Sequence, residues 1–146
     1  MPSVEDPQQI CLACFHLISA AAQTCPYCGA DLAAFSARDY VDKLIAALAH
    51  PLSEVRMRAI IALGWRGEVH AAQPLLDLAL RHPVDVVEGL AVLDSLARMG
   101  VEGRGAMAAL AERHRAHAVR EAARQMYRSL GHTDKTESEN NEGRDV

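Results

Sequence analysis

Aromatic residues are scarce in this chain of 146 residues: they account for 4% of it, and Trp65 is its single tryptophan. Half of the residues are nonetheless apolar, and alanine and leucine predominate among them. A core made of such residues forms by close packing of helices rather than around large rings. The composition therefore predicts an all-α fold, with room for one modest domain and a small appendage.

The sequence also lacks a run of the ~20 apolar residues that a membrane-spanning helix needs. Residues 10–22 are apolar enough to resemble a signal peptide, but the charges before them, Glu5 and Asp6, are acidic, whereas a signal peptide begins with positive charge. We therefore expect a cytoplasmic protein without a membrane partner. No phosphate-binding glycine motif, metalloprotease helix or nucleophile elbow is present, so we do not expect an enzyme.

Cysteine is absent after residue 28. The four cysteines up to that position form two Cys-x-x-Cys pairs with ten residues between the pairs. Each pair can form a tight turn that directs two thiolates to one point, and two such turns complete a tetrahedral site. In a cytoplasmic chain, clustered cysteines bind metal more often than they form disulfides. The predicted metal ligands are Cys11, Cys14, Cys25 and Cys28.

The second cysteine pair carries additional turn signals. Pro26 presets the turn, and Gly29 lets backbone amides approach the sulfurs. This segment resembles the second knuckle of rubredoxin-like domains, and residues 8–35 resemble a short zinc ribbon. Phe15 stands where the first knuckle usually has glycine, so we expect a less regular turn there. The resemblance implies bound zinc, with iron as the alternative because four thiolates suit both ions. With iron, the resemblance implies a small rubredoxin-like electron carrier as a further alternative function.

A pattern that begins at His50 returns at His82 and again, after the same interval, at His114. Valines and alanines recur in the same register. A fixed period of this length indicates a helical repeat array, because one helical hairpin cannot bury its own apolar face and needs a neighbour. The histidines fall at the C-terminal ends of the first helices, where the helix dipole favours a positive charge.

Three helical hairpins are predicted from turn and cap signals. Ser36 and Asp39 resemble a capping box at the first helix, Pro51 and Pro83 separate the helices of the first two hairpins, and Gly131 ends the last. The expected order along the chain is a flexible N-terminus (1–7), the zinc ribbon (8–35), the repeats (36–131) and a disordered acidic tail (132–146).

The second helix of the first hairpin reads Val-Arg-x-x-Ala-x-x-Ala-Leu-Gly, from Val55 to Gly64. Over residues 39–131 this pattern resembles HEAT repeats of the phycobilisome-lyase-like kind, although Glu88 stands where the first hairpin has Arg56. The resemblance implies a short α-solenoid of three HEAT-like hairpins that acts as a non-catalytic adaptor for another protein. It does not imply lyase activity.

Both ends of a repeat array need cover for their apolar faces. In register, Ile60 and Val92 are followed by Arg124, so the last helix becomes polar where earlier helices meet a following repeat. At the other end we expect the ribbon to lie against the first helices through Leu32 and Phe35. The ribbon then serves as a cap, as a docking surface, or as both.

One acidic residue falls on a helix stripe that we expect to be buried. Asp94 projects between Val87, Leu90 and Ala91, and a buried carboxylate needs a partner. Three explanations remain open: a polar contact in a groove lined by the second helices, an internal ion pair, or a local shift of the helix register. The candidate partner-binding residues are Arg58, Trp65 and Asp94.

Positive residues exceed negative ones by three between residues 101 and 131, although the whole chain has a net charge of −4. This cluster is the one feature suited to nucleic acid, and it supports an alternative function as a nucleic-acid-associated accessory protein. A solvated terminal face explains the same charges. The residues concerned are Arg113, Arg115, Arg120, Arg124 and Arg128.

Overall fold

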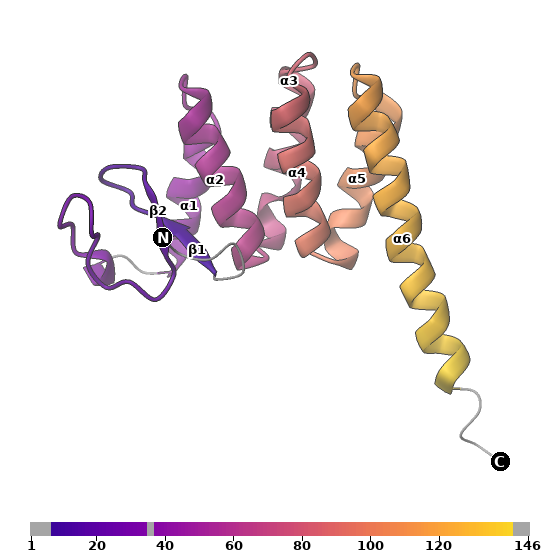
Figure 1. The fold of residues 1–146 in the computed structure, drawn as a ribbon, viewed down its shortest axis with the longest axis horizontal. Coiled ribbons are helices and arrows are strands. Elements are labelled where there is room, and N and C mark those ends of the chain that lie inside the picture. Colours follow the sequence, from indigo (N-terminus) through magenta and orange to yellow (C-terminus); the bar gives the residue numbers. More distant parts are fainter. Residues whose placement is uncertain (1–6, 35–36, 142–146) are drawn as a thin grey trace.

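A computed structural model of the chain describes the backbone of residues 7–34 and 37–141 and the side chains of residues 7–33 and 40–131. A short N-terminal sheet precedes six α-helices within these ranges (Figure 1). The elements are β1 (Gln8–Ile10), β2 (Leu17–Ser19), α1 (Ala37–Ala47), α2 (Ser53–Arg66), α3 (Ala72–Arg81), α4 (Val86–Arg98), α5 (Val101–Arg113) and α6 (His117–Asn141). Single 3-10 turns lie at Leu32–Ala34 and Val69–Ala71.

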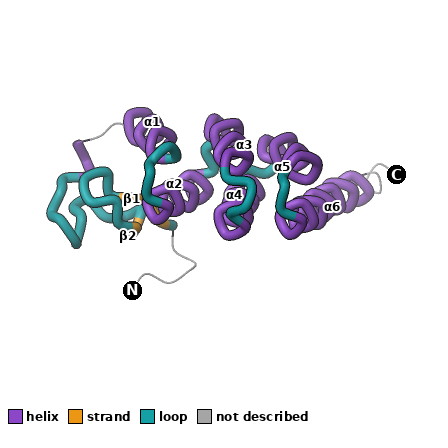
Figure 2. Tube along the Cα trace, turned by 90° about the horizontal axis from the view of Figure 1, so that it is seen from above, coloured by secondary structure: helices purple, strands orange, loops and turns teal. Residues whose placement is uncertain are grey.

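The helices form three pairs that stack in one direction, as the repeat period predicts. Seen from above, α1, α3 and α5 form one row and α2, α4 and α6 form a second (Figure 2). Contacts run within each pair and from each pair to the next, notably between α2 and α4, between α4 and α6, and between α3 and α5. The molecule is therefore an all-α solenoid with a small sheet at its N-terminal end.

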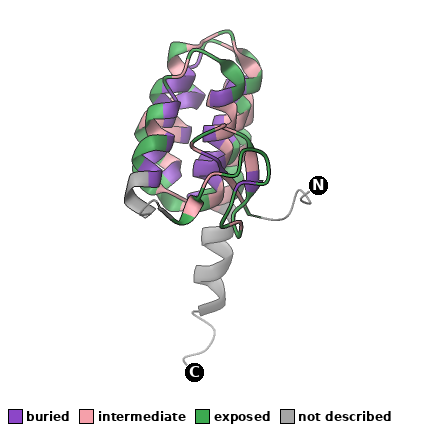
Figure 3. Cartoon of the chain, turned by 90° about the vertical axis from the view of Figure 1, so that its left-hand side faces the viewer, coloured by how far each residue is buried: buried purple, intermediate pink, exposed green. Residues whose placement is uncertain are grey.

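Small residues let the helices approach closely, which is how a core with few aromatic residues is filled. Buried residues are concentrated on the sides of the ribbons that face each other (Figure 3). Between α2 and α4, Ser95 Oγ donates to the carbonyl oxygen of Ile60 at 2.7 Å. A Cβ atom added to Gly64 would lie 2.6 Å from Ser95 Oγ, so only glycine fits at this crossing. Among the phenylalanine, tyrosine and tryptophan side chains that the structure describes, only Tyr40 is buried.

The spacing of the second helices departs from the strict repeat period. A strict repeat of the start of α2 at Ser53 would place the starts of α4 and α6 at Asp85 and His117. α4 begins instead at Val86, one position later, whereas α6 begins at His117 and is back in register. The turn between His82 and α4 holds the extra residue.

The buried positions shift with the helix. Val55, Glu88 and Val119 are therefore structurally equivalent, with 6%, 2% and 0% of their surface exposed.

This shift corrects two predictions in the second pair. Glu88 occupies the position of the buried Val55 rather than that of Arg56. Asp94 is exposed, so its expected burial is wrong, and the local register shift is the explanation that the structure supports. Val87 and Leu90, on the same stripe, are 70% and 38% exposed. This stripe therefore faces solvent rather than the core.

Glu88 is a buried carboxylate that has two basic partners. Arg56 Nε donates to Glu88 Oε1 at 2.8 Å, and His82 Nδ1 lies 2.6 Å from Glu88 Oε2. Arg56 also donates through Nη1 to the carbonyl oxygens of His50 and Pro51, at 2.9 and 3.0 Å. A charge is tolerated inside a protein when it is paired in this way. The network joins the turn of the first pair to α4.

The recurring histidines organise the turns rather than serving only as cations. His50 Nδ1 accepts the backbone N–H of Leu52 at 3.1 Å, and His114 Nδ1 accepts that of Ala116 at the same distance. His114 is 1% exposed, and burial lowers its pKa. The expectation of a positive charge at the helix end is therefore wrong for His114. Arg120 Nη1 completes this turn by donating to the carbonyl oxygen of His114 at 2.7 Å.

The C-terminal end of the stack is polar, as the register predicts. Arg124 is exposed, whereas its structural equivalents Ile60 and Leu93 are fully buried. The expected end of the last helix at Gly131 is wrong, because α6 continues to Asn141 and extends beyond the other helices (Figure 1). One glycine inside a helix costs only about 1 kcal/mol, and no proline follows it.

Two predictions at the ends of the repeats concern residues that the structure does not describe. Ser36, the expected cap of the first helix, and residues 142–146 of the acidic tail lie outside the described residues, as do residues 1–6. Of the expected tail, residues 132–141 have helical backbone. Among the described residues, no helix has both the length and the apolar character to cross a membrane.

We predict that Glu88→Ala lowers the free energy of unfolding by about 3 kcal/mol, because it leaves Arg56 without its buried partner. Urea unfolding followed by circular dichroism measures this. Glu88→Val should lose less, since valine occupies the equivalent position in the other two pairs. The control is Asp94→Ala, an exposed carboxylate on the same helix, with a change within about 0.5 kcal/mol. Equal losses for Glu88→Ala and Asp94→Ala would contradict the role of the network.

Candidate metal centre

The N-terminal module consists of two cysteine turns supported by short pieces of sheet. β1 and β2 pair antiparallel, with Gln8 opposite Ser19, and the first turn lies between them. An isolated bridge between Thr24 and Asp31 closes the second turn. Ile18, at the centre of β2, is buried with Cys11 and Cys25 in a small core of this module. Throughout, the ribbon denotes residues 8–33.

The two turns have the same backbone geometry. The N–H of Phe15 donates to the carbonyl oxygen of Cys11 at 2.7 Å, and the N–H of Gly29 donates to that of Cys25 at 2.9 Å. Both donor residues lie in the left-handed region, with φ of 61° at Phe15 and 77° at Gly29. The expected irregularity of the first turn is therefore wrong. Phe15 adopts the glycine-like conformation at a cost of about 1–2 kcal/mol.

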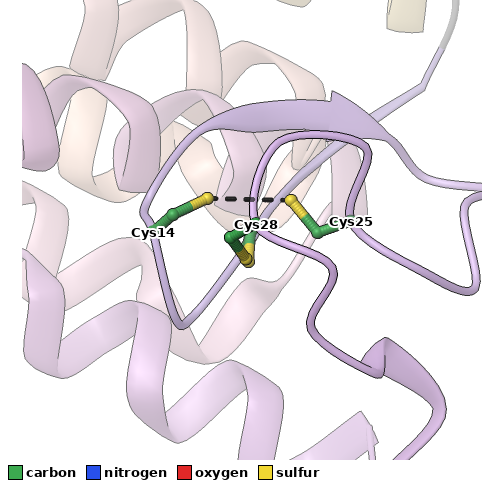
Figure 4. A group of neighbouring side chains, drawn as sticks. Cys14, Cys25 and Cys28 are labelled. Atoms are coloured by element: carbon green, nitrogen blue, oxygen red, sulfur yellow. Dashed lines mark hydrogen bonds between the residues drawn. The ribbon is translucent and has the colours of Figure 1, made fainter.

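The four cysteine sulfurs converge on one point. All four Sγ atoms lie within 4.8 Å of one another. Cys11 Sγ is 3.5 Å from Cys28 Sγ, and Cys14 Sγ is 3.7 Å from Cys25 Sγ, the pair joined by a dashed line in Figure 4. Metal–sulfur bonds of ~2.3 Å give a tetrahedron with edges of roughly 3.8 Å. The free thiols therefore fit a single tetrahedral metal ion.

The thiols differ in how readily they ionise. Burial raises the pKa of Cys25, but the backbone N–H groups of Cys28 and Tyr27 and the neighbouring thiols outweigh it and lower this pKa to about 6. Burial raises the pKa of Cys14 to about 12. Like charges this close disfavour one another, so the four thiols do not all ionise unaided. A bound cation compensates the four negative charges and displaces the protons.

His16 lies beside the sulfurs without completing the ligand set. Its Nδ1 is 3.3 Å from Cys14 Sγ, within hydrogen-bonding distance. Its ring stacks on Tyr27, with centroids 4.4 Å apart and planes 15° from parallel. Four cysteines already fill a tetrahedral shell. His16 therefore interacts with one ligand and keeps its orientation through the exposed Tyr27.

The ribbon is attached to the first helix pair by specific contacts. Ile10 is fully buried in the helical core. The Tyr40 hydroxyl accepts the N–H of Ile10 at 2.6 Å and donates to the carbonyl oxygen of the same residue at 2.8 Å. Burial raises the pKa of Tyr40 to about 12. Arg58 Nη1 donates to the carbonyl oxygen of Phe15 at 2.8 Å. The first cysteine turn is thus bonded to both α1 and α2.

The ribbon therefore covers the N-terminal end of the stack, but not through Leu32, one of the two residues predicted for this contact. Leu32 packs against the ribbon's own small core, and Phe35 lies outside the described residues. Ile10, Leu12 and Phe15 pack against the helices instead. The sequence offered a weak signal for this arrangement, because Ile10 and Leu12 flank the first metal ligand and need burial of their own.

The candidate partner-binding residues lie along the second helices but differ in their surroundings. Arg58 is engaged with Phe15 and lies 4.0 Å from Glu54. Trp65 is half-buried, with the Arg98 guanidinium 3.9 Å from its ring centroid. Asp94 is exposed on α4 and makes no ion pair within the described part of the chain. The structure does not gather the three into one cluster of contacts.

A hollow of about 420 Å³ lies beside Arg58, between α2, the start of α4 and the ribbon. The second-helix groove denotes this hollow together with Leu90, the neighbouring exposed apolar residue on α4. The strict repeat period did not predict this hollow, because the period assigned Val87 to the core. The residues that line the hollow include Leu17, Met57, Arg58, Ile61, Asp85 and Val87.

The basic residues of the third pair do not form one continuous row. Arg113 and Arg115 are exposed at the turn between α5 and α6, and Arg128 is exposed on α6. Arg120 is directed to the backbone of the turn, and Arg124 pairs with Glu121 at 3.4 Å. Two of the five arginines are therefore engaged within the third pair.

The fold and the site define a short α-solenoid with an N-terminal four-cysteine ribbon. Within it, residues 27–97 match the family model described as HEAT repeats. The match runs from the second cysteine turn through most of α4, and the third helix pair continues the stack beyond it. No curated protein and no solved structure matches the chain. The matched segment supports the predicted HEAT-like hairpins, and HEAT repeats generally bind proteins.

We predict that the purified chain binds one metal ion and that a chelator raises hydrogen exchange across the ribbon, because metal binding supplies the folding energy of so small a module. Metal analysis and exchange mass spectrometry measure the two effects. Cys25→Ser should reproduce the effect of the chelator. His16→Ala is the control and should keep one ion per chain. Protection of the ribbon that is unchanged by chelation would contradict the site.

A second prediction concerns the attachment of the ribbon. Tyr40→Phe should lower the free energy of unfolding by about 1–2 kcal/mol, because two buried backbone groups of Ile10 lose their hydrogen-bond partner. Tyr27→Phe removes an exposed hydroxyl and should change it by less than about 0.5 kcal/mol. Metal content should stay the same in both variants. If the two substitutions have the same effect in urea unfolding, the Tyr40 hydroxyl does not hold the ribbon.

Proposed function

We propose that the protein is a non-catalytic adaptor that binds another protein through the second-helix groove. The exposure of Val87 and Leu90 is the observation that carries this proposal. These residues lie beside a hollow partly lined by Met57 and Ile61, and contiguous exposed apolar surface on a soluble protein marks an interaction site. The HEAT repeats match points to the same class of partner.

The metal in this proposal is a structural zinc ion. Four protein ligands fill a tetrahedral shell and leave no position for a substrate, which is the arrangement of structural rather than catalytic zinc sites. Iron is the alternative ion, and it would give a red protein with thiolate-to-iron absorption, whereas the zinc protein is colourless. Free thiols and a thiolate-bound metal suit a reducing compartment, so we place the protein in the cytoplasm.

The ribbon contributes to the partner surface as well as to stability. Leu17, on β2, forms part of the lining of the groove, together with residues of α2 and α4. Arg58 connects the two units, because it lines the groove and donates to the carbonyl oxygen of Phe15. In this proposal, loss of the metal weakens partner binding by displacing one side of the groove. Trp65 and Asp94 extend the contact surface further along α2 and α4.

The alternative function, an accessory protein on nucleic acid, has less support. Its best observation is the exposure of Arg113, Arg115 and Arg128. Contact with a phosphate backbone uses several unpaired cations along one path, and each neutralised phosphate adds to the salt dependence of binding. Arg120 and Arg124 interrupt such a path because they are engaged within the third pair.

Affinity capture from native lysate, with and without nuclease, tests the adaptor proposal. We expect a protein partner whose recovery is unaffected by nuclease. Val87→Asp should lower its affinity roughly tenfold or more, because an unpaired carboxylate buried in the interface costs about 2 kcal/mol or more. Val101→Asp is the matched control, since Val101 is also 70% exposed and also lies in the first turn of its helix.

Two outcomes would count against the adaptor. Equal losses for Val87→Asp and Val101→Asp would show that the groove is not the contact surface. Loss of every partner after nuclease treatment would favour the nucleic-acid alternative instead.

A further inference from the structure

A second hollow, of about 350 Å³, lies between the turn that follows α3 and the turn that follows α5. Three of its six lining residues are arginines, contributed by two successive helix pairs, and no carboxylate lines it. We call it the turn pocket. Its lining residues are Leu80, Arg81, Pro83, Arg113, His114 and Arg115.

The three arginines of the turn pocket have no carboxylate partner within the described residues. Other arginines of this protein do have partners: Arg56 pairs with Glu88, and Arg124 pairs with Glu121. Positive charges that share one hollow repel one another. Because all three side chains are exposed, solvent screens this repulsion, but an anion that entered the hollow would be attracted by all three.

The helix dipole accounts for only part of this cluster. Arg81 and Arg113 are the last residues of α3 and α5, and the helix dipole favours a positive charge at a helix C-terminus. Arg115 lies between α5 and α6, outside both helices. Arg115 is exposed and needs no partner, but together with the two helix-end arginines it gives the hollow a positive charge that suits a ligand of opposite charge.

The turn that carries Arg113 and Arg115 is held in place from both sides. His114, between them, is 1% exposed, and its Nδ1 accepts the N–H of Ala116 at 3.1 Å. Arg120 Nη1 donates to the carbonyl oxygens of His114 and Arg115, both at 2.7 Å. Binding to a preorganised turn loses less conformational entropy than binding to a flexible one. The backbone under the two guanidinium groups is therefore already ordered.

We propose that the turn pocket binds a phosphoryl group carried on a side chain of a partner protein. The planar guanidinium group donates two parallel hydrogen bonds to phosphate oxygens, and clusters of arginines recognise phosphorylated segments in this way. The pocket is a compact hollow rather than a row, which suits one doubly charged group. Nucleic acid suits it less, because Arg120 and Arg124 are not available to continue a path along a strand.

The position of the pocket is compatible with the proposed adaptor role and does not depend on it. Pro83 lines the turn pocket, and Asp85, two residues later in the same turn, lines the second-helix groove. A single extended partner segment can therefore reach both. Val87, which tests the groove, does not line the turn pocket, so either proposal can fail without the other.

Nuclear magnetic resonance titration of the metal-bound full chain tests the phosphoryl site. The probe is a Gly-Gly-phosphoserine-Gly-Gly peptide at low ionic strength, with the serine peptide, inorganic pyrophosphate and a single-stranded oligonucleotide as comparison arms. We expect saturable amide shifts confined to Arg81, His82, Val84 and residues 113–116 with the phosphopeptide. The serine peptide should give none.

The double variant Arg113→Gln/Arg115→Gln should weaken phosphopeptide binding tenfold or more. The matched control Arg128→Gln, which removes an exposed arginine of α6 that does not line the pocket, should bind as the parent does. A thermal melt of each variant verifies that the fold is intact. Substitutions at these exposed positions should leave the melting temperature unchanged.

Three results would overturn the proposal. The first is the absence of saturable shifts with the phosphopeptide. The second is binding of pyrophosphate without binding of the phosphopeptide, which would assign the pocket to a free anion. The third is stronger binding of the oligonucleotide with shifts that extend to Arg128, which would assign the same charges to nucleic acid.

Discussion

A helix pair cannot bury its apolar side alone and needs a neighbouring pair or another cover, and this constraint determines the rest of the molecule. Inside the stack, Gly64 and Ser95 bring α2 and α4 close enough for a hydrogen bond between side chain and backbone. At the C-terminal end, Arg124 replaces the buried aliphatic residues of the earlier pairs. At the N-terminal end, the ribbon covers α1 and α2. The two ends of the stack are thus protected differently, by polar side chains at the C-terminal end and by the ribbon at the N-terminal end.

The ribbon is too small to fold on apolar burial alone, and its two sources of order are different in kind. The cysteine sulfurs supply a tetrahedral site, which orders the two turns when a metal ion is bound. Tyr40 and Arg58 then bond the backbone of the first turn to the helices. Phe15, which has a left-handed conformation in this turn, accepts one of these bonds through its carbonyl oxygen, from Arg58. The first turn thus contains two of the converging cysteines and also the backbone groups that bond to α1 and α2.

Residue spacing predicted the convergence of the four cysteine sulfurs and the order of the helix pairs, because both depend on local, regular patterns. It did not predict the placement of Asp94 and Glu88, because one extra residue in the turn after His82 moves α4 out of the strict period. It missed Tyr40 because one buried hydroxyl has no periodic signature. The contact of the ribbon through Ile10 rather than Leu32 depends on tertiary packing, which spacing does not encode.

The longer turn of the second pair has a consequence for how such proteins diversify. One added residue rotates the following helix by about 100° relative to the repeat pattern. The same side chains then exchange inner and outer positions: a glutamate enters the interior and aliphatic residues reach the surface. A change in turn length can therefore create a new recognition surface without altering any residue of the helix, provided that neighbouring repeats supply a counter-charge, as Arg56 does here.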